Sequence, residues 1–134
     1  MTLSPAAFDT IRTHFLDTRT GPGDYDLIVT GDLGAMGVEA LMALFRETGI
    51  SIGGKLTDCG NLIFDPVRQD VHAGGSGCGC SAVVLCSELL GKLNAGKLKK
   101  ILFCGTGALL SPTSTQQSLP IPGICHAVCI TSGR

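Results

Sequence analysis

The chain has 134 residues, 44% of them apolar, which suits one folded domain with a modest core. Its net charge of −1 gives no electrostatic case for binding nucleic acid or an anionic membrane surface. No apolar run reaches the ~18 residues of a membrane span, and the N-terminus lacks the basic start and apolar block of a secretory signal.

Helices and strands alternate along the chain, which predicts a layered α/β sheet. Ser4-Pro5 marks a helix start, and Phe8, Ile11 and Phe15 then recur at helical spacing. The predicted elements are, in order, a helix over 5–17, a strand over 27–30 covered on both faces, a turn over 31–37, a helix over 38–48, a long loop over 49–75 that could hold a short strand at 61–64, a helix over 78–94, a strand over 100–104, a loop over 105–117 and a strand over 126–131.

The helix over 78–94 is apolar around most of its circumference, so we expect it to be buried. This helix and the two apolar strands need more cover than the chain supplies. The pattern therefore predicts a partner, either a second copy or a segment that is missing from this chain.

Seven cysteines with no sign of export predict reduced thiols. Four of them lie in apolar segments and are expected to pack as small core residues: Cys86, Cys104, Cys125 and Cys129. Cys78 and Cys80 could supply half of a zinc site with Cys59 and His72, but the C-x-C spacing is shorter than usual. A zinc or redox module is therefore the weakest hypothesis, and we predict no metal site.

Residues 72–80, HAGGSGCGC, lead into the start of the predicted helix. Such a stretch can direct several backbone N–H groups at one carboxylate, and glycine lets the backbone approach a ligand closely. His72, at its mouth, is a candidate ligand residue. The same glycines could instead allow the helix and the sheet to cross closely. Cys78 and Cys80 could have lowered pKa values near the helix start, but a packing role is favoured.

Four segments carry a resemblance to a known family. HAGGSGCGCSAVVLC, ILFCGTGALLSPTSTQQ, DYDLIVTGDLG and IPGICHAV resemble the stage V sporulation protein AD family of spore-forming bacteria, over residues 5 to 130 or so. The resemblance implies a thiolase-like fold similar to β-ketoacyl synthase III, in which two halves with βαβαββ cores form a five-layered αβαβα sandwich. This chain resembles the C-terminal half only, as a single half domain over 1–134 whose core is incomplete at its N-terminus.

The resemblance also implies a function. It suggests a non-enzymatic protein that binds dipicolinic acid (pyridine-2,6-dicarboxylate), with calcium as a further candidate, and supports its uptake into the forespore and its release in germination. The implied place is the cytoplasmic side of the spore inner membrane, as a peripheral, soluble part of a channel complex. The implied partners are the other channel proteins and the missing N-terminal half or a second copy, and no cofactor is expected.

The alternative function is an acyl-thioester condensing enzyme. In the synthase family, the nucleophile belongs to the absent half, and a histidine follows the strand that matches 27–30. Here Gly31 and Asp32 stand at that place, so the resemblance implies an incomplete catalytic set. His72 could occupy the place of a second polar residue of the family.

The predicted ligand site combines the glycine-rich stretch with polar residues of two turns: His72, Gly75, Ser76, Gly77, Cys78, Asp32, Ser111 and Thr113. Asp58 and Asp65, in the long loop, are expected to cap turns, which is the commonest use of aspartate in glycine-rich loops.

Overall fold

A computed structural model describes residues 3–65, 67–70, 79–108, 112–118 and 120–133. They form a four-stranded sheet in the order β2-β1-β3-β4. β1 pairs in parallel with β2 and β3, and β3 pairs antiparallel with β4. The strands are β1 (Leu27–Thr30), β2 (Leu56–Asp58), β3 (Lys100–Ala108) and β4 (Gly123–Thr131).

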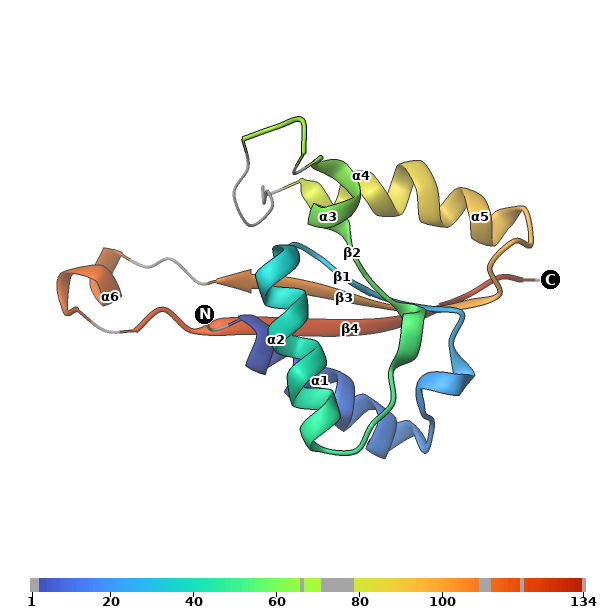
Figure 1. Ribbon diagram of the computed structural model, residues 1–134, viewed down its shortest axis with the longest axis horizontal. Helices are drawn as coiled ribbons and strands as arrows, with labels where there is room; N and C mark the ends of the chain where they lie inside the picture. The colour runs from blue at the N-terminus through green and yellow to red at the C-terminus, as the bar shows by residue number, and fades with distance from the viewer. Residues whose placement is uncertain (1–2, 66, 71–78, 109–111, 119, 134) are drawn as a thin grey trace.

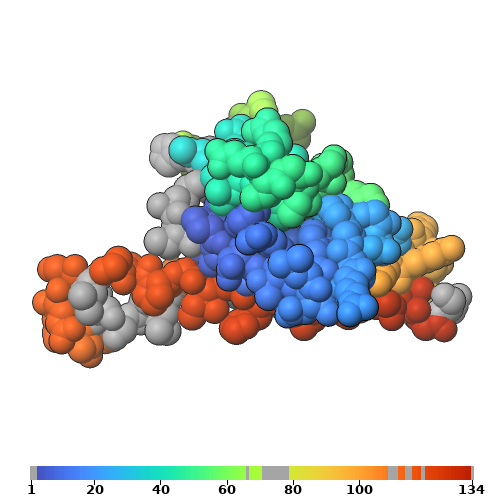
Figure 2. Space-filling view, turned by 90° about the horizontal axis from the view of Figure 1, so that it is seen from below, coloured from blue at the N-terminus to red at the C-terminus, as the bar shows by residue number. Residues whose placement is uncertain are grey.

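Two helices cover one face of the sheet (Figures 1 and 2). They are α1 (Leu3–Thr18) and α2 (Gly34–Glu47). Apolar residues at helical spacing face the sheet from α1, and the rings of Phe8 and Phe45 meet edge to face, with centroids 5.1 Å apart. Short 3-10 turns flank this layer at Pro22–Asp24 and Gly53–Lys55.

The other face carries the second helical layer (Figure 1). It contains α3 (Cys59–Ile63) and one longer helix made of α4 (Cys80–Val84), a π-helical turn η3 (Leu85–Leu89) and α5 (Leu90–Asn94). Val84 and Leu93 are buried against Val29 and Ile101 of the sheet. The opposite side of the helix faces solvent, as the 55% exposure of Val83 shows. The prediction that this helix is buried therefore holds for one side only, in the chain by itself.

β3 and β4 continue beyond the body of the sheet as a two-stranded hairpin arm, Gly105–Ala108 and Gly123–His126. β1 accompanies β3 only as far as Cys104. A short helix, α6 (Pro112–Gln116), lies at the far end of the arm (Figure 1). The predicted strand over 100–104 was thus too short, and the predicted loop over 105–117 contains strand and helix.

Most predicted elements are confirmed. The strands and crossover helices follow the order β-α-β-α-β-β, so the core expected to be incomplete at its N-terminus has all of its strands and is preceded by α1. The strand suggested at 61–64 is wrong, because α3 occupies 61–63 with Phe64 as its C-cap, and β2 lies earlier, at Leu56–Asp58. The cause is Asp58, whose side chain caps α3 by accepting a hydrogen bond from the Asn61 N–H. α2 begins at Gly34, four residues before the predicted start at 38.

Candidate functional site

The strands β1 and β2 end at the edge of the sheet where α2, α3 and α4 begin. In open α/β sheets, ligands commonly bind outside this carboxyl edge. The polar and thiol groups that the structure gathers here come from the ends of β1 and β2, from β3 and from the helix starts: Asp32, Asp58, Cys59, Cys80, Ser81 and Thr106.

Asp58 is almost completely buried and serves the fold. Its carboxylate accepts hydrogen bonds from the Thr30 hydroxyl at 2.6 Å and from the backbone N–H groups of Leu33 and Gly34 at 2.9 and 3.1 Å. A fourth donor, the Asn61 N–H, lies at 3.3 Å. One side chain therefore caps both α2 and α3, which confirms the capping role predicted for Asp58.

Asp65 also has the predicted capping role. Its carboxylate accepts hydrogen bonds from the N–H groups of Val67 and Arg68, at 2.9 and 3.3 Å. The Arg68 guanidinium lies 3.7 Å away as an exposed ion pair. All of these contacts lie within the turn that Asp65 begins, so this aspartate is not counted among the candidate site residues.

Asp32 lies beside Thr106 at the end of β1. The Thr106 hydroxyl donates to Asp32 Oδ1 at 2.7 Å and accepts from the Asp32 N–H at 3.3 Å. Gly31 makes this approach possible: a Cβ there would lie 3.0 Å from Thr106 Oγ1, 3.1 Å from the Thr106 backbone nitrogen and 3.6 Å from Ser81 Cβ. A side chain at position 31 would therefore require Thr106 to shift by a few tenths of an ångström.

The thiols of this edge are held in their protonated form. Burial, followed by the carboxylate of Asp58, raises the pKa of Cys59 to about 12. Burial also raises the pKa of Cys80, with Asp32 and Asp58 adding to the effect. Because the thiolate is the nucleophilic form, neither cysteine is activated. The suggestion that Cys80 has a lowered pKa is wrong, and the packing role favoured for it is confirmed.

The other cysteines divide between core and surface. Cys104 and Cys125 are buried, as predicted, whereas Cys86 and Cys129 are exposed. The prediction for these two is wrong, because Cys86 lies on the open side of the long helix and Cys129 lies on an edge strand.

The structure places two of the predicted ligand residues. Asp32 is half-buried at the carboxyl edge, whereas Thr113 is exposed on α6 at the end of the hairpin arm and is not brought beside Asp32 (Figure 1). The remaining predicted residues lie outside the described part of the chain: His72, Gly75, Ser76, Gly77, Cys78 and Ser111. They directly precede Gly79 and α4, or α6, in the sequence, and their site roles stay predictions.

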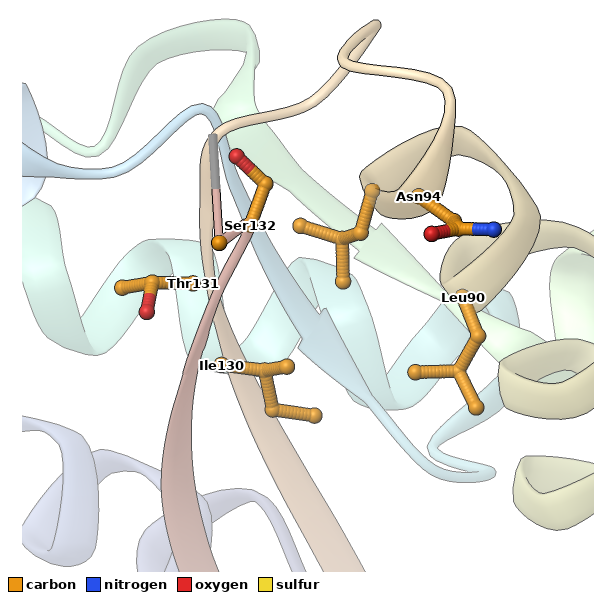
Figure 3. Close-up of a pocket in the computed structure, with 7 residues that line it drawn as sticks. Leu90, Asn94, Ile130, Thr131 and Ser132 are labelled. Atoms are coloured by element: carbon orange, nitrogen blue, oxygen red, sulfur yellow. The ribbon is translucent and has the colours of Figure 1, made fainter.

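Two cavities lie away from Asp32. One, of about 360 Å³, is bounded by α5 and the end of β4, and Figure 3 shows Leu90 and Asn94 on the helix beside Ile130 and Ser132 on the strand side. The other, of about 270 Å³, lies between α3 and the π-turn, with Leu62, Ile63 and Val83 among its lining residues. The walls of the first cavity are polar and apolar in nearly equal part, and those of the second are mainly apolar.

In the part of the chain that the structure describes, no three His, Cys, Asp or Glu side chains are grouped as a metal ion would require. No helix there is long and apolar enough to cross a membrane.

Thr106 and Ser81 are site residues that the sequence interpretation missed. Thr106 was assigned to a loop, because the strand was expected to end at Cys104 and glycines flank the threonine. Thr106 is the second residue after the predicted strand end at Cys104, just as Asp32 is the second residue after Thr30, and this equal offset is the signal that could have identified it.

Comparisons with known proteins agree with the resemblance. The family model described as stage V sporulation protein AD matches residues 1–131. A stage V sporulation protein AD of Bacillus subtilis (strain 168) is 49% identical over 126 residues, which cover 94% of this chain and 37% of that protein. The chain thus spans a little over a third of the length of its curated relative. On both findings, the chain belongs to the stage V sporulation protein AD family.

Proposed function

We propose that the chain is part of a non-enzymatic sporulation protein that binds dipicolinic acid and supports its entry into the forespore and its release in germination. In this proposal it acts as a peripheral, soluble part of a channel complex on the cytoplasmic side of the spore inner membrane. Family membership supports the sporulation role, since the matched relative is named for it. The ligand, its transport and the location of the protein are proposed from the resemblance and from the chemistry of the carboxyl edge.

The observation that carries the proposal is the pair Asp32–Thr106 beside thiols with raised pKa values. A condensing enzyme needs an activated thiol, which the resemblance assigns to the half absent from this chain, and the two buried, protonated cysteines at this edge do not supply one. Gly31 also stands where the synthases carry a histidine, and a side chain there would press against Thr106. This edge therefore favours binding over acyl transfer.

Calcium would make the edge suitable for a dicarboxylate. The negative charge of Asp32 repels a bare dipicolinate dianion, because like charges at short range cost free energy. Calcium is a hard ion that takes six to eight oxygen ligands or so, from carboxylates, carbonyls and water. A calcium ion carried with the ligand would join a dipicolinate carboxylate to Asp32, and the glycine-rich stretch before α4 would supply N–H donors to the second carboxylate.

Calorimetric titration of dipicolinate, with and without calcium, tests this proposal. We expect calcium to lower the dissociation constant of dipicolinate for the parent chain. In the presence of calcium, Asp32→Asn should raise this constant at least about tenfold, since a contact with a charged group contributes about 1.5–3 kcal/mol. The amide still accepts from Thr106, so the fold is retained. Asp17→Asn, at an exposed position of α1, is the matched control.

Two outcomes would contradict the proposal. Calcium-independent binding that Asp32→Asn leaves unchanged would remove Asp32 from the site. Condensation or decarboxylation of an acyl-thioester by the chain, above background, would favour the alternative enzyme.

A further inference from the structure

Thr106 lies on β3 just beyond the part of this strand that pairs with β1. The parallel pairing ends at Thr30 and Cys104, and from Gly105 onward β4 is the one strand neighbour of β3 within the described residues. The glycines on either side of Thr106 bring no side chain, and a Cβ on Gly107 would meet nothing within 4 Å. The Thr106 hydroxyl is therefore the polar side-chain group that this part of β3 offers to the turn after β1.

The Thr106 hydroxyl makes both of its hydrogen bonds to Asp32. It donates its one hydrogen to Asp32 Oδ1 at 2.7 Å and accepts from the Asp32 N–H at 3.3 Å. Threonine is β-branched, so few rotamers are open to it and the hydroxyl is held in one direction. Because one hydroxyl contacts both the carboxylate and the backbone of Asp32, it fixes the side chain relative to its own main chain.

The second carboxylate oxygen of Asp32 is left for another partner. Within the described residues, no hydrogen bond reaches Oδ2, and the side chain is half-buried. The charge of Asp32 acts at the start of α4, where it adds to burial in raising the pKa of Cys80. The carboxylate therefore lies near the residue at which the glycine-rich stretch ends in the sequence.

One oriented carboxylate oxygen fits a calcium ion that arrives with dipicolinate. Calcium takes about six to eight oxygen ligands, and the two carboxylates of dipicolinate and water can supply most of them. The protein then needs to add few oxygens, but each must point at the ion. Hydrogen bonds to a ligating carboxylate set its orientation, and removing such a partner usually weakens metal binding by about 10–100-fold.

We propose that Thr106 is a positioning residue for Asp32: its hydroxyl holds Oδ1, so that Oδ2 is presented to the calcium ion bound with dipicolinate. This inference rests on the proposed function, which assigns the calcium contact to Asp32. Thr106 itself touches neither the ion nor the ligand. Its effect on binding therefore passes through Asp32 and requires calcium.

A double-mutant cycle tests this role, with calorimetric titration of dipicolinate into the chain in the presence and absence of calcium. With calcium, Thr106→Val should raise the dissociation constant about tenfold, at the low end of the usual loss. Thr106→Ser keeps the hydroxyl and should stay close to the parent. Without calcium, Thr106→Val should leave the constant unchanged. Added to Asp32→Asn, it should cause no further loss, because the carboxylate that it positions is gone.

Thr10→Val is the matched control. Thr10 is half-buried like Thr106, and its hydroxyl also holds the hairpin arm, by donating to the Cys125 carbonyl at 2.9 Å. Its replacement removes one hydroxyl contact of the arm without touching Asp32, so the dissociation constant in calcium should not change. Circular dichroism melts measure the stability of each variant and separate positioning from a general loss of structure.

The outcomes distinguish this inference from the proposed function. Calcium-dependent binding that Asp32→Asn leaves unchanged would overturn both. A loss in Asp32→Asn with none in Thr106→Val would keep Asp32 in the site and refute the positioning role. Equal losses in Thr106→Val and Thr10→Val, a loss that is the same without calcium, or a loss that persists in Asp32→Asn would show that Thr106 only supports the fold.

Discussion

Gly31 is the residue on which the geometry of the carboxyl edge depends. Adding a Cβ there forces it against the Thr106 backbone nitrogen at 3.1 Å, and a strand backbone cannot move aside cheaply. We expect Gly31→Ala to lower the free energy of unfolding by about 1–3 kcal/mol, the usual cost of overpacking. Chemical denaturation measures the change.

Gly91→Ala is the matched control for this prediction. Gly91 is exposed inside α5, with nothing within 4 Å of an added Cβ. Alanine there should stabilise the chain by about 0.5–1 kcal/mol, since glycine is a poor helix former. Equal effects of the two substitutions would refute the close approach of β1 to Thr106.

The thiols make a second residue-scale prediction. With a pKa of about 12, Cys59 stays protonated in neutral and mildly alkaline solution, and the raised pKa of Cys80 acts in the same direction. Alkylation of the native chain near pH 8, read by mass spectrometry, should label the exposed Cys86 and Cys129 first. Early labelling of Cys80 would instead indicate an activated thiol at the helix start and would favour the acyl-transfer alternative.

At the scale of elements, Asp58 joins the end of β2 to the starts of two helices. Asp58→Asn keeps the size of the side chain but turns an N–H₂ group toward backbone donors. We expect a loss of about 1.5–3 kcal/mol in the free energy of unfolding, because the lost contacts involve a charged acceptor. Asp65→Asn, which alters one exposed turn, should cost less than about 1 kcal/mol. A smaller loss at Asp58 than at Asp65 would argue against the double cap.

Element prediction from the sequence succeeded where the pattern was local. The helical spacing of Phe8, Ile11 and Phe15 gave α1, and the apolar run at 27–30 gave β1. The prediction of elements failed where tertiary contacts determine whether a segment is a strand. β2 has three residues and no alternating pattern, and its pairing with β1 defines it as a strand. The length of β3 beyond Cys104 depends on its pairing with β4, because its glycines weaken any strand signal.

The residues of the candidate site could be predicted only in part, for the same reason. Asp32 was singled out because it lies two residues after a strand whose end the sequence shows. Its partner Thr106 lies 74 positions away and is brought near by the parallel pairing of β1 and β3. No local pattern contains that information.

At the scale of the whole molecule, the described residues leave two separate surfaces without cover. One is the β4 edge. The other is the open side of the second helical layer, where Leu62 and Val83 are 54% and 55% exposed and Ile63 and Leu90 are each 40% exposed. Apolar surface left in water costs about 25 cal/mol per Å². The matched relative is much longer than this chain, so a segment of its remaining length is the natural cover for the helical side.

Co-expression tests this assignment of the helical side. We expect the chain to form a complex with the part of the Bacillus subtilis relative that the match leaves out, seen as a single peak of higher mass in size-exclusion with light scattering. Val83→Lys should weaken the complex, because it places a charge in a buried apolar contact. Val128→Lys should leave it intact, since β4 is a different surface. A chain that is a stable monomer beside that segment, or a complex that only Val128→Lys disrupts, would show that the helical side is not the surface it covers.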